Sequence, residues 1–424
     1  MASSGTFTKD GPQIIPEPLP DLGAGTKGKA LIPHPAGRVK YGALVQFIRM
    51  LLFTTWFTVV SISIQATQWL GSWLYFVNKD YYYAYMSLTK QFYGLFITSI
   101  TEWFSPTLIR VSGDKSMRGQ LFKTKDGRLR TDFNERLIMI ANHQIYTDWL
   151  YLWWIAYANK MHGHIYIILK ESLKWIPILG WGMQFYSFIF MARKWNHDKP
   201  RIQHRLGKLK AQHSGPMSGS HSLDPMWLLI FPEGTNLSPN TRKKSQSWAE
   251  KQGLADMKHQ LLPRSTGLQF CLQELHGTVD WIYDCTIAYE GTPQGGFAQD
   301  YFTLRSTYFQ GRPPKSVNMY WRRFAIADIP VDDHDAFDLW LRERWVEKDA
   351  LLEHYVQNGR FPADEGHDSD GKALGSKSKV IKGAGYIETE VKLSHWSETG
   401  QIFVVLGALA LLINIGTKVY NFLI

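Results

Sequence analysis

Residues 137–160 read LIMIANHQIYTDWLYLWWIAYANK, and this stretch indicates how the chain folds. It begins with five apolar residues, LIMIA, which is a length and composition typical of a buried β-strand. A polar segment follows, and the mixed stretch from Asp148 to Lys160 is long enough to form a helix. The sequence therefore predicts a strand, a loop and a helix in immediate succession.

The same alternation continues along the middle of the chain. Longer mixed stretches separate further apolar runs, and one of them, residues 338–356, is predicted as a helix. Further strands are predicted at residues 165–169, 188–192, 227–231, 283–289 and 317–321. This alternation predicts an α/β domain over residues 113–361, with a mixed, mostly parallel sheet covered by helices on both faces. Residues 196–225 are predicted as a surface loop with room for one short basic helix.

The N-terminal part of the chain contains a long uncharged segment. Residues 1–40 are rich in Gly, Pro and Lys and are predicted as a disordered tail. Residues 51–77 carry no charge, and about 20 apolar residues suffice to cross a bilayer. This segment fits one tilted membrane helix or a shallow hairpin, and the alternative is a core helix of a soluble protein. Residues 41–112 as a whole are predicted as a helical membrane anchor, in which residues 81–111 form an interfacial or a core helix.

The C-terminal part of the chain holds a second apolar segment. Residues 402–416 contain no charge, and residues 401–424 are predicted as a membrane helix. Lys418 lies near the end of this helix, where a lysine can extend its ammonium group toward lipid head groups. Residues 362–400 are polar and are predicted as a linker between the α/β domain and this helix.

The composition favours negatively charged partners. The 424 residues carry a formal net charge of +10, which suits nucleic acid, anionic lipids or phosphorylated substrates. The sequence has no helix-turn-helix, zinc-finger or RNP-type pattern, so that nucleic acid is not an expected partner. Aromatic residues make up 14% of the chain, which suits a protein at a membrane–water boundary. The only two cysteines, Cys271 and Cys285, cannot form a zinc cluster, and no metal site is expected.

Residues 142–148, NHQIYTD, carry the residue types of a proton-transfer site. Loops at strand ends are where α/β sheets place functional groups. A histidine can take a proton from an attacking hydroxyl because its pKa lies near neutral pH, and a carboxylate can orient its ring. His143 and Asp148 match these roles if Asp148 lies in the first turn of the following helix. The alternative for Asp148 is a helix-capping residue.

A second polar segment follows another predicted strand, in LLIFPEGT at residues 228–235. Pro232 ends the strand, and Gly234 allows the backbone to approach a ligand closely. Glu233 could bind a hydroxyl group or pair with an arginine, and Thr235 could cap a helix whose N–H groups attract anions. The alternative is a turn with a helix cap and no ligand.

NHQIYTDW at residues 142–149 and FPEGT at residues 231–235 together resemble the two signature blocks of the glycerolipid acyltransferase family, which includes 1-acylglycerol-3-phosphate acyltransferases. The resemblance implies a glycerol-phosphate acyltransferase-like fold, with His143 and Asp148 as the catalytic pair. GMQFYSFIFMARKW, residues 182–195, resembles the middle block, whose arginine contacts phosphate, and Arg193 occupies that position. The acceptor site implied by these blocks comprises Asn142, Arg193, Phe231, Pro232, Glu233, Gly234 and Thr235.

One further segment departs from the family pattern. LLPRSTG, residues 261–267, resembles a fourth block, but Arg264 stands where an apolar residue is usual, which leaves its role open. This segment and VDWIYDCTIAYEG at residues 279–291 resemble the eukaryotic branch that includes lysocardiolipin and lysophosphatidylinositol acyltransferases.

The resemblance implies a reaction and a location. It implies transfer of an acyl chain from acyl-CoA, as co-substrate and without a cofactor, onto the free hydroxyl of a lysophospholipid such as lysophosphatidate. The expected partners are this acceptor, acyl-CoA and the lipid bilayer, and the expected location is the endoplasmic reticulum membrane. Acyl-chain remodelling of lysophosphatidylinositol or lysocardiolipin is the alternative within the family. A non-catalytic membrane lipid-binding protein is the alternative outside it.

Overall fold

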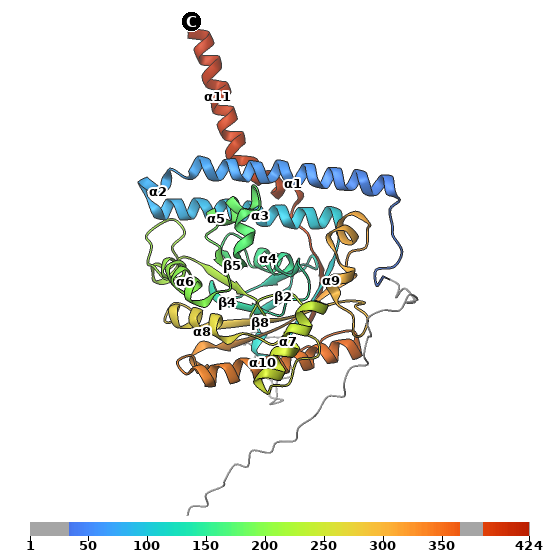
Figure 1. Cartoon of the computed structure of the whole chain (residues 1–424). Coiled ribbons are helices and arrows are strands. Elements are labelled where there is room, and N and C mark those ends of the chain that lie inside the picture. The colour runs from blue at the N-terminus through green and yellow to red at the C-terminus, as the bar shows by residue number, and fades with distance from the viewer. Residues whose placement is uncertain (1–33, 365–384, 424) are drawn as a thin grey trace, which may run out of the picture. The chain divides into compact units, whose positions relative to one another are not determined.

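The structure, a computed structural model, describes residues 34–364 and 385–423. Within these residues, eight strands form one sheet in the order β10-β1-β9-β8-β4-β7-β5-β6 (Figure 1). The strands are β1 (Leu108–Gly113), β4 (Arg136–Ala141), β5 (Ile165–Lys170), β6 (Ile189–Met191), β7 (Met226–Ile230), β8 (Trp281–Tyr289), β9 (Ser316–Ala325) and β10 (Tyr386–Glu390). A separate sheet pairs β2 (Leu121–Lys123) with β3 (Leu129–Thr131). Most of the predicted tail, residues 1–33, lies outside the described residues.

The large sheet is mixed and mostly parallel, as the sequence predicts. β4 pairs in parallel with β7 and β8, and β5 pairs in parallel with β6 and β7. β1 is parallel to β9, whereas the pairs β8–β9 and β1–β10 are antiparallel. Because parallel strands end at the same edge of a sheet, the carboxyl ends of β8, β4 and β7 lie next to one another.

Six strands, β4 to β9, confirm the strands predicted from apolar runs. The pattern does not predict β1 and β10, and both correct the expected domain boundaries. β10 lies within the expected linker, residues 362–400, and pairs with β1 as the edge of the sheet. β1 lies within the expected membrane anchor, residues 41–112, although it is a strand of the sheet. Residues 365–384 of the expected linker lie outside the described residues.

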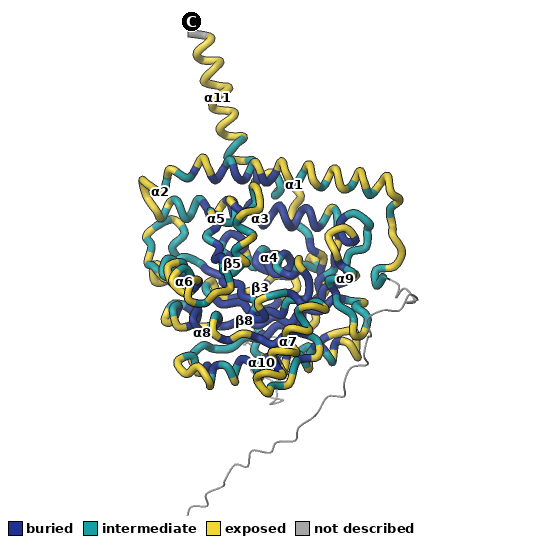
Figure 2. Tube along the Cα trace, in the orientation of Figure 1, coloured by how far each residue is buried: buried dark blue, intermediate teal, exposed yellow. Residues whose placement is uncertain are grey.

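Helices cover both faces of the sheet. Alternate residues of β4 pack in opposite directions, as expected for a strand. Leu137 and Met139 pack with α3 (Lys79–Phe104) and α4 (Asp148–Ala158). Ile138 and Ile140 pack on the other face with α6 (Trp195–Leu209), α7 (Pro239–Gln252), α8 (Ser265–Glu274) and α10 (His334–Asn358). The centre of the sheet is therefore buried on both sides, which explains why its strands are continuous apolar runs (Figure 2).

The predicted helices at residues 148–160 and 338–356 are confirmed by α4 and α10. α6 spans 15 residues where the sequence predicts a loop with one short basic helix, so that the helical part is longer than expected. The remaining helical segments of the described residues are α1 (Ala43–Gly71), α2 (Leu74–Val77), η1 (Lys115–Met117), η2 (Glu171–Trp175), α5 (Leu179–Phe185), η3 (Ser220–Ser222), α9 (Ala298–Tyr301), η4 (Arg305–Phe309), η5 (Ile326–Asp328), η6 (Trp396–Phe403) and α11 (Val404–Leu423).

α1 is one continuous helix that packs along α3 (Figure 1). The hairpin considered for residues 51–77 does not form in the middle of this run, because α1 is continuous to Gly71 and the chain reverses only at the end of the run, at residues 72–78. The polar residues on the buried side of α1 are Ser61, Gln65, Thr67 and Gln68. The exposed apolar residues of α1 include Leu44, Phe47, Leu51, Leu52, Val59 and Ile62. The outward side of α1 is therefore apolar, unlike that of a helix at a water-facing surface, and the core-helix alternative does not fit it.

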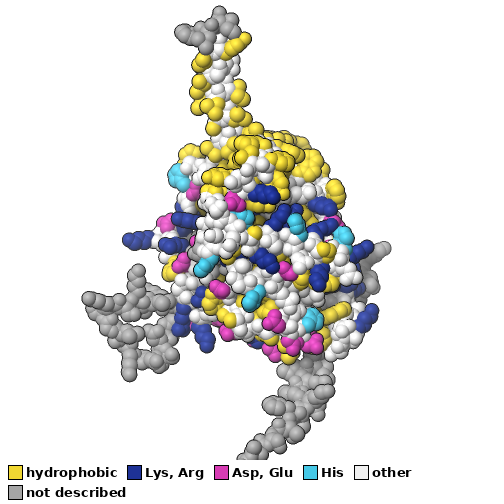
Figure 3. Space-filling model, turned by 90° about the vertical axis from the view of Figure 1, so that its left-hand side faces the viewer, with side chains coloured by type: hydrophobic (Ala, Val, Ile, Leu, Met, Phe, Trp, Pro, Cys, Tyr) yellow, Lys and Arg dark blue, Asp and Glu magenta, His cyan; other side chains and the backbone are white. Residues whose placement is uncertain are grey.

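Two stretches within the described residues are long and apolar enough to cross a membrane, namely Ala43–Val77 and Trp396–Asn421. Few residues of either stretch are buried, in contrast to α3, whose second half is mostly buried in the core. Figure 3 shows hydrophobic side chains gathered at the top of the molecule around the base of α11, with lysines and arginines below them. This distribution suits a protein whose α1 and α11 contact lipid.

Candidate active site

The carboxyl ends of three neighbouring strands converge on one site. His143 lies two residues beyond the end of β4, Glu233 lies three residues beyond the end of β7, and Tyr289 is the last residue of β8. The registers Ala141↔Cys285 and Ile140↔Ile230 hold these three strand ends at the same edge of the sheet. Two loops and one strand thus bring together residues that are up to 146 positions apart in the sequence.

His143 and Asp148 form the pair that the sequence predicts. The His143 Nδ1 atom lies 2.8 Å from the Asp148 Oδ2 atom. Asp148 begins α4, and the loop before it folds back, so that the Gln144 and Ile145 backbone N–H groups donate to the same oxygen at 2.6 and 3.0 Å. Asp148 is fully buried, whereas the His143 side chain is 17% exposed. The carboxylate therefore holds Nδ1 and leaves Nε2 as the nitrogen that can accept a proton.

The loop after β7 supports His143 from the opposite side. The Phe231 ring stacks on the His143 imidazole, with 4.4 Å between ring centroids and 24° between planes. The Leu237 backbone N–H donates to the His143 carbonyl oxygen at 2.7 Å. These contacts fix both the ring and the backbone of His143.

Glu233 has a different role from the predicted one. Its side chain is buried, and its two oxygens accept the backbone N–H groups of His143 at 3.0 Å and Leu261 at 3.3 Å. Burial raises the pKa of Glu233 to about 8, although these two hydrogen bonds favour the ionised form. Glu233 therefore ties three loops together, and its carboxylate is occupied by backbone groups rather than open to an acceptor lipid.

Asn142 and Thr235 do not lie as predicted for acceptor-binding residues. Asn142 is fully buried, and its amide group makes two hydrogen bonds to the Ile287 backbone, at 3.0 Å to the carbonyl oxygen and 2.7 Å from the N–H. It joins β4 to β8, and its amide is buried between the two strands instead of facing a ligand. The helix after the second block begins at Pro239 and is capped by Ser238, whose side chain accepts the Thr241 N–H, so that Thr235 is not its cap.

Pro232, Gly234 and Arg193 meet at one corner of the site. Gly234 has a φ of +71°, which favours glycine, and its N–H donates to the Phe231 carbonyl oxygen at 2.9 Å. An Arg193 guanidinium N–H donates to the Gly234 carbonyl oxygen at 2.6 Å. The Arg264 N–H donates to the Pro232 carbonyl oxygen at 2.9 Å. Burial and the nearby charge of Arg264 lower the pKa of Arg193, and two exposed guanidinium groups give this corner positive charge.

An apolar pocket of about 210 Å³ lies beside α4. Trp149, which directly follows Asp148, lines this pocket. Other lining residues are Gln65 of α1, Trp153 of α4, Leu169 of β5 and Met183 of α5. The pocket thus lies between α1 and the sheet. No group of His, Cys, Asp and Glu in the described part of the chain is arranged to hold a metal ion.

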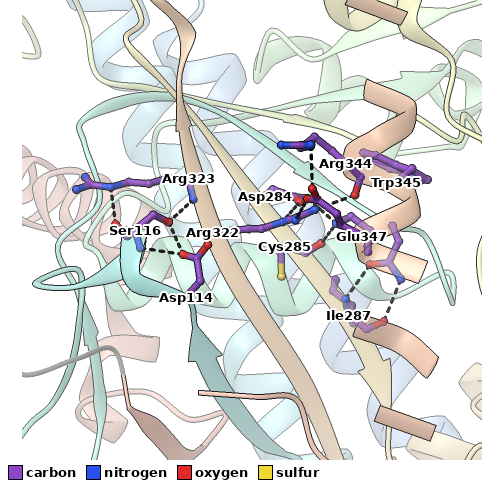
Figure 4. Close-up of polar contacts among 12 residues, drawn as sticks. Asp114, Ser116, Asp284, Cys285, Ile287, Arg322, Arg323, Arg344, Trp345 and Glu347 are labelled. Atoms are coloured by element: carbon purple, nitrogen blue, oxygen red, sulfur yellow. Dashed lines mark hydrogen bonds and ion pairs between the residues drawn. The ribbon is translucent and has the colours of Figure 1, made fainter. Parts of the chain in front are cut away.

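Behind the site, a buried ion-pair network joins β8 to β9 and α10 (Figure 4). The Lys348 Nζ atom donates to Asp284 Oδ1 at 2.5 Å and to the Cys285 carbonyl oxygen at 2.6 Å. The Arg322 Nε atom donates to the other Asp284 oxygen at 2.9 Å and Arg322 also pairs with Glu347. The sequence shows these residues only as isolated charges inside a predicted strand and helix, so the network could not be predicted.

Comparisons with known proteins find families and relatives to which this chain is similar. A family described as acyltransferase matches residues 109–290, and one described as acyltransferase C-terminus matches residues 307–381. An uncharacterized acyltransferase of Schizosaccharomyces pombe is 36% identical, over 85% of this chain and 94% of that protein. A 2-acyl-1-lysophosphatidylinositol acyltransferase of Saccharomyces cerevisiae is 38% identical, over 66% of this chain and 77% of that protein. Lysocardiolipin acyltransferase 1 of Gallus gallus is 35% identical, over 53% of this chain and 55% of that protein.

Proposed function

Because the chain belongs to the acyltransferase family, we propose that it transfers the acyl group of acyl-CoA onto the free hydroxyl of a lysophospholipid. The observation that carries this proposal is the hydrogen bond between His143 Nδ1 and the buried Asp148 carboxylate, at a partly exposed position. A histidine held in this way is suited to act as a general base toward an alcohol.

In the proposed reaction, His143 Nε2 takes the proton of the acceptor hydroxyl while its oxygen attacks the thioester carbonyl carbon. Asp148 stabilises the imidazolium that forms. The carbon–sulfur bond then breaks, and the imidazolium returns the proton to the leaving thiolate. The products are an ester and free CoA thiol, and His143 regains its starting state.

The acceptor phosphate is proposed to bind at the corner of Arg193 and Arg264. The Arg193 guanidinium group is bonded to the Gly234 carbonyl oxygen, and the Arg264 backbone is bonded to Pro232, directly beyond Phe231, which stacks on His143. A guanidinium group can bind two phosphate oxygens at once, which would orient the acceptor hydroxyl. Phe231, Pro232 and Gly234 then shape the acceptor site, whereas Asn142, Glu233 and Thr235 support it.

An acyl chain is proposed to occupy the apolar pocket beside Trp149. The pocket reaches α1 at Gln65, and the outward side of α1 is apolar. A chain could therefore pass from a bilayer, beneath α1, to the neighbourhood of the catalytic pair. We propose on this basis that α1 and α11 hold the enzyme on a lipid bilayer, and that this is the endoplasmic reticulum membrane.

Lysophosphatidylinositol is a second candidate acceptor beside lysophosphatidate. It is favoured by the relative named for that lipid, which matches 66% of this chain. A competition assay with equal amounts of lysophosphatidate, lysophosphatidylinositol and lysocardiolipin, with products separated by mass, would decide between them.

The proposal is tested by His143→Ala in vesicle-bound protein supplied with acyl-CoA and lysolipid. Loss of a general base typically lowers the rate by about 10²- to 10⁴-fold, and association with vesicles should be unchanged. Arg242→Ala is a matched control on the neighbouring helix α7, because its guanidinium is bonded to Asp256 and lies outside the site. Wild-type turnover by His143→Ala would contradict the proposal. Absence of turnover in the wild-type protein with every acceptor and donor would instead support a non-catalytic lipid-binding protein.

A further inference from the structure

The Asp148 carboxylate has one hydrogen-bond donor that neither the loop nor His143 supplies. Its Oδ2 atom accepts three hydrogen bonds, from His143 Nδ1 and from two backbone N–H groups. Its Oδ1 atom accepts one, at 2.5 Å, from the Tyr289 hydroxyl. Among the described residues no other protein group is bonded to Oδ1. The phenol of Tyr289 therefore completes the coordination of a fully buried carboxylate.

Tyr289 is held in place independently of Asp148. It ends β8, two residues beyond Ile287, whose backbone is joined to Asn142 by two hydrogen bonds. Its ring packs against Tyr151 of α4 and Phe302, with centroid distances of 6.2 and 5.8 Å. Farther along β8, the Asp284 network fixes the strand to α10 (Figure 4). The hydroxyl is thus presented to Asp148 by a rigid strand, 141 positions away in the sequence.

The tyrosine acts only as a hydrogen-bond donor. Burial and the neighbouring Asp148 charge raise the pKa of Tyr289 far above its ordinary value, so that the phenol stays protonated wherever the enzyme works. A protonated phenol draws charge from Oδ1 and favours the ionised carboxylate. It also prevents the carboxylate from rotating, because the two oxygens are held from different sides. One oxygen faces β8, and the other faces His143.

We propose that Tyr289 is a positioning residue of the catalytic pair, whose hydroxyl keeps Asp148 ionised and fixed so that His143 presents Nε2 to the acceptor. The proposal rests on the proposed function, since it assigns Tyr289 a part in the same proton transfer. Nothing in the sequence pattern separates this tyrosine from the other aromatic residues of its strand.

The titratable groups around Asp148 decide how a pH profile is interpreted. They are His143, Glu233, Tyr151, Cys285 and Tyr289, with Lys348 beyond them. Burial raises the pKa values of Tyr151 and Cys285, so that both remain neutral in the working range. Glu233, with a pKa of about 8, changes charge there. Variants compared with one another must therefore leave Glu233 untouched.

The test is Tyr289→Phe, with Tyr283→Phe as the matched control. Tyr283 lies on the same strand and is buried, but its hydroxyl is bonded to Gln120 and Asn134 instead of a carboxylate. Turnover by Tyr289→Phe should fall about 10- to 100-fold, the range for losing a hydrogen bond to a charged group. Without the phenol, the Asp148 carboxylate loses its donor at Oδ1 and interacts more strongly with the imidazolium form of His143. The acid limb of the pH profile of kcat/KM should therefore move up by about half a pH unit or more. Tyr283→Phe should leave that limb unchanged.

Two further measurements separate positioning from simple packing. When Asp148 is already replaced by Asn, adding Tyr289→Phe should lower turnover by less than about 3-fold, because the partner of the hydroxyl has already been altered. If Tyr289→Phe does not fold, 3-fluorotyrosine at position 289, which is a stronger donor, should move the acid limb downward.

An unshifted acid limb, or full additivity with Asp148→Asn, would overturn the role of Tyr289 while leaving His143 as the base. Activity in His143→Ala would overturn the proposed function itself, so the two failures can be told apart.

Discussion

Two fully buried carboxylates, Asp284 and Asp148, both contact β8, but different groups compensate their negative charges. Asp284 lies within β8 and contacts two cations, Lys348 at 2.5 Å and Arg322 at 2.9 Å. Asp148 is bonded to the last residue of β8, and no lysine or arginine of the described chain pairs with it. Its donors are two backbone N–H groups, one phenol and the imidazole of His143.

The difference separates a structural ion pair from a site built for proton transfer. A buried charge needs compensation, and lysine and arginine supply it permanently. An imidazole supplies a full positive charge only when it takes up a proton. The positive charge beside Asp148 can therefore appear and disappear during a reaction. We therefore expect substitutions at Asp284 and its cations to affect stability, and substitutions at Asp148 to affect turnover.

The largest effect is expected for Asp148→Asn. The amide can still accept the two backbone N–H groups, but it cannot stabilise the imidazolium, so turnover should fall about 10³- to 10⁴-fold. The melting temperature should change little, because the side chains have the same shape. Initial rates and thermal unfolding in lipid nanodiscs would measure both quantities. Asp284→Asn is the control and should keep wild-type turnover per folded molecule. A turnover of Asp148→Asn within tenfold of wild type would remove the contrast between the two carboxylates.

A smaller effect, on stability alone, is expected for Lys348→Met. The change takes away one of the two cations of Asp284 and the donor of the Cys285 carbonyl oxygen, and removing one partner of a buried ion pair typically costs about 3–5 kcal/mol. The free energy of unfolding should fall by that amount, while turnover per folded molecule stays near wild type. Restoring the charge balance with Lys348→Met and Asp284→Asn together should recover part of the loss. An unchanged melting temperature of Lys348→Met would show that the network does not hold α10 to the sheet.

A pH-dependent effect on stability is expected for a third buried carboxylate, Glu233, which accepts two backbone N–H groups and has no cation bonded to it among the described residues. Its pKa is raised from 4.5 to about 8, so that between these values the folded protein holds a proton that the unfolded chain has released. Stability should therefore fall as the pH rises from about 5 to 8, by up to about 1.4 kcal/mol per pH unit. Glu233→Gln should flatten this dependence of the melting temperature on pH. Equal slopes in both proteins would mean that Glu233 is ionised throughout.

The sequence predicts the strands from β9 to β6 better than the β10–β1 end of the sheet. β4 to β9 appear as apolar runs because both of their faces are buried. β10 has the pattern YIETE, with only alternate residues buried, and it lies within a polar stretch that resembles a linker. β1 carries Arg110 and Ser112 and is equally inconspicuous. Strands that carry polar residues, such as β10 and its neighbour β1, therefore escape a search for apolar runs.

The catalytic pair could be predicted because it is local, whereas its supports are not. His143 and Asp148 lie five residues apart in one loop, so their types and spacing suffice. Tyr289, Glu233 and the bonds of Asn142 depend on which strands become neighbours of β4, and the sequence pattern does not determine that order. The cap of α7 was assigned to the wrong residue because Ser238, followed by Pro239 and Thr241, forms a better cap than Thr235.

The apolar outward side of α1 has a practical consequence for purifying the protein. Its apolar side chains lie outward along most of its length, separately from those of α11. A chain shortened by α11 would still expose the apolar side of α1, and in water such molecules would associate through it. We expect the shortened chain to stay monodisperse only when detergent micelles cover α1.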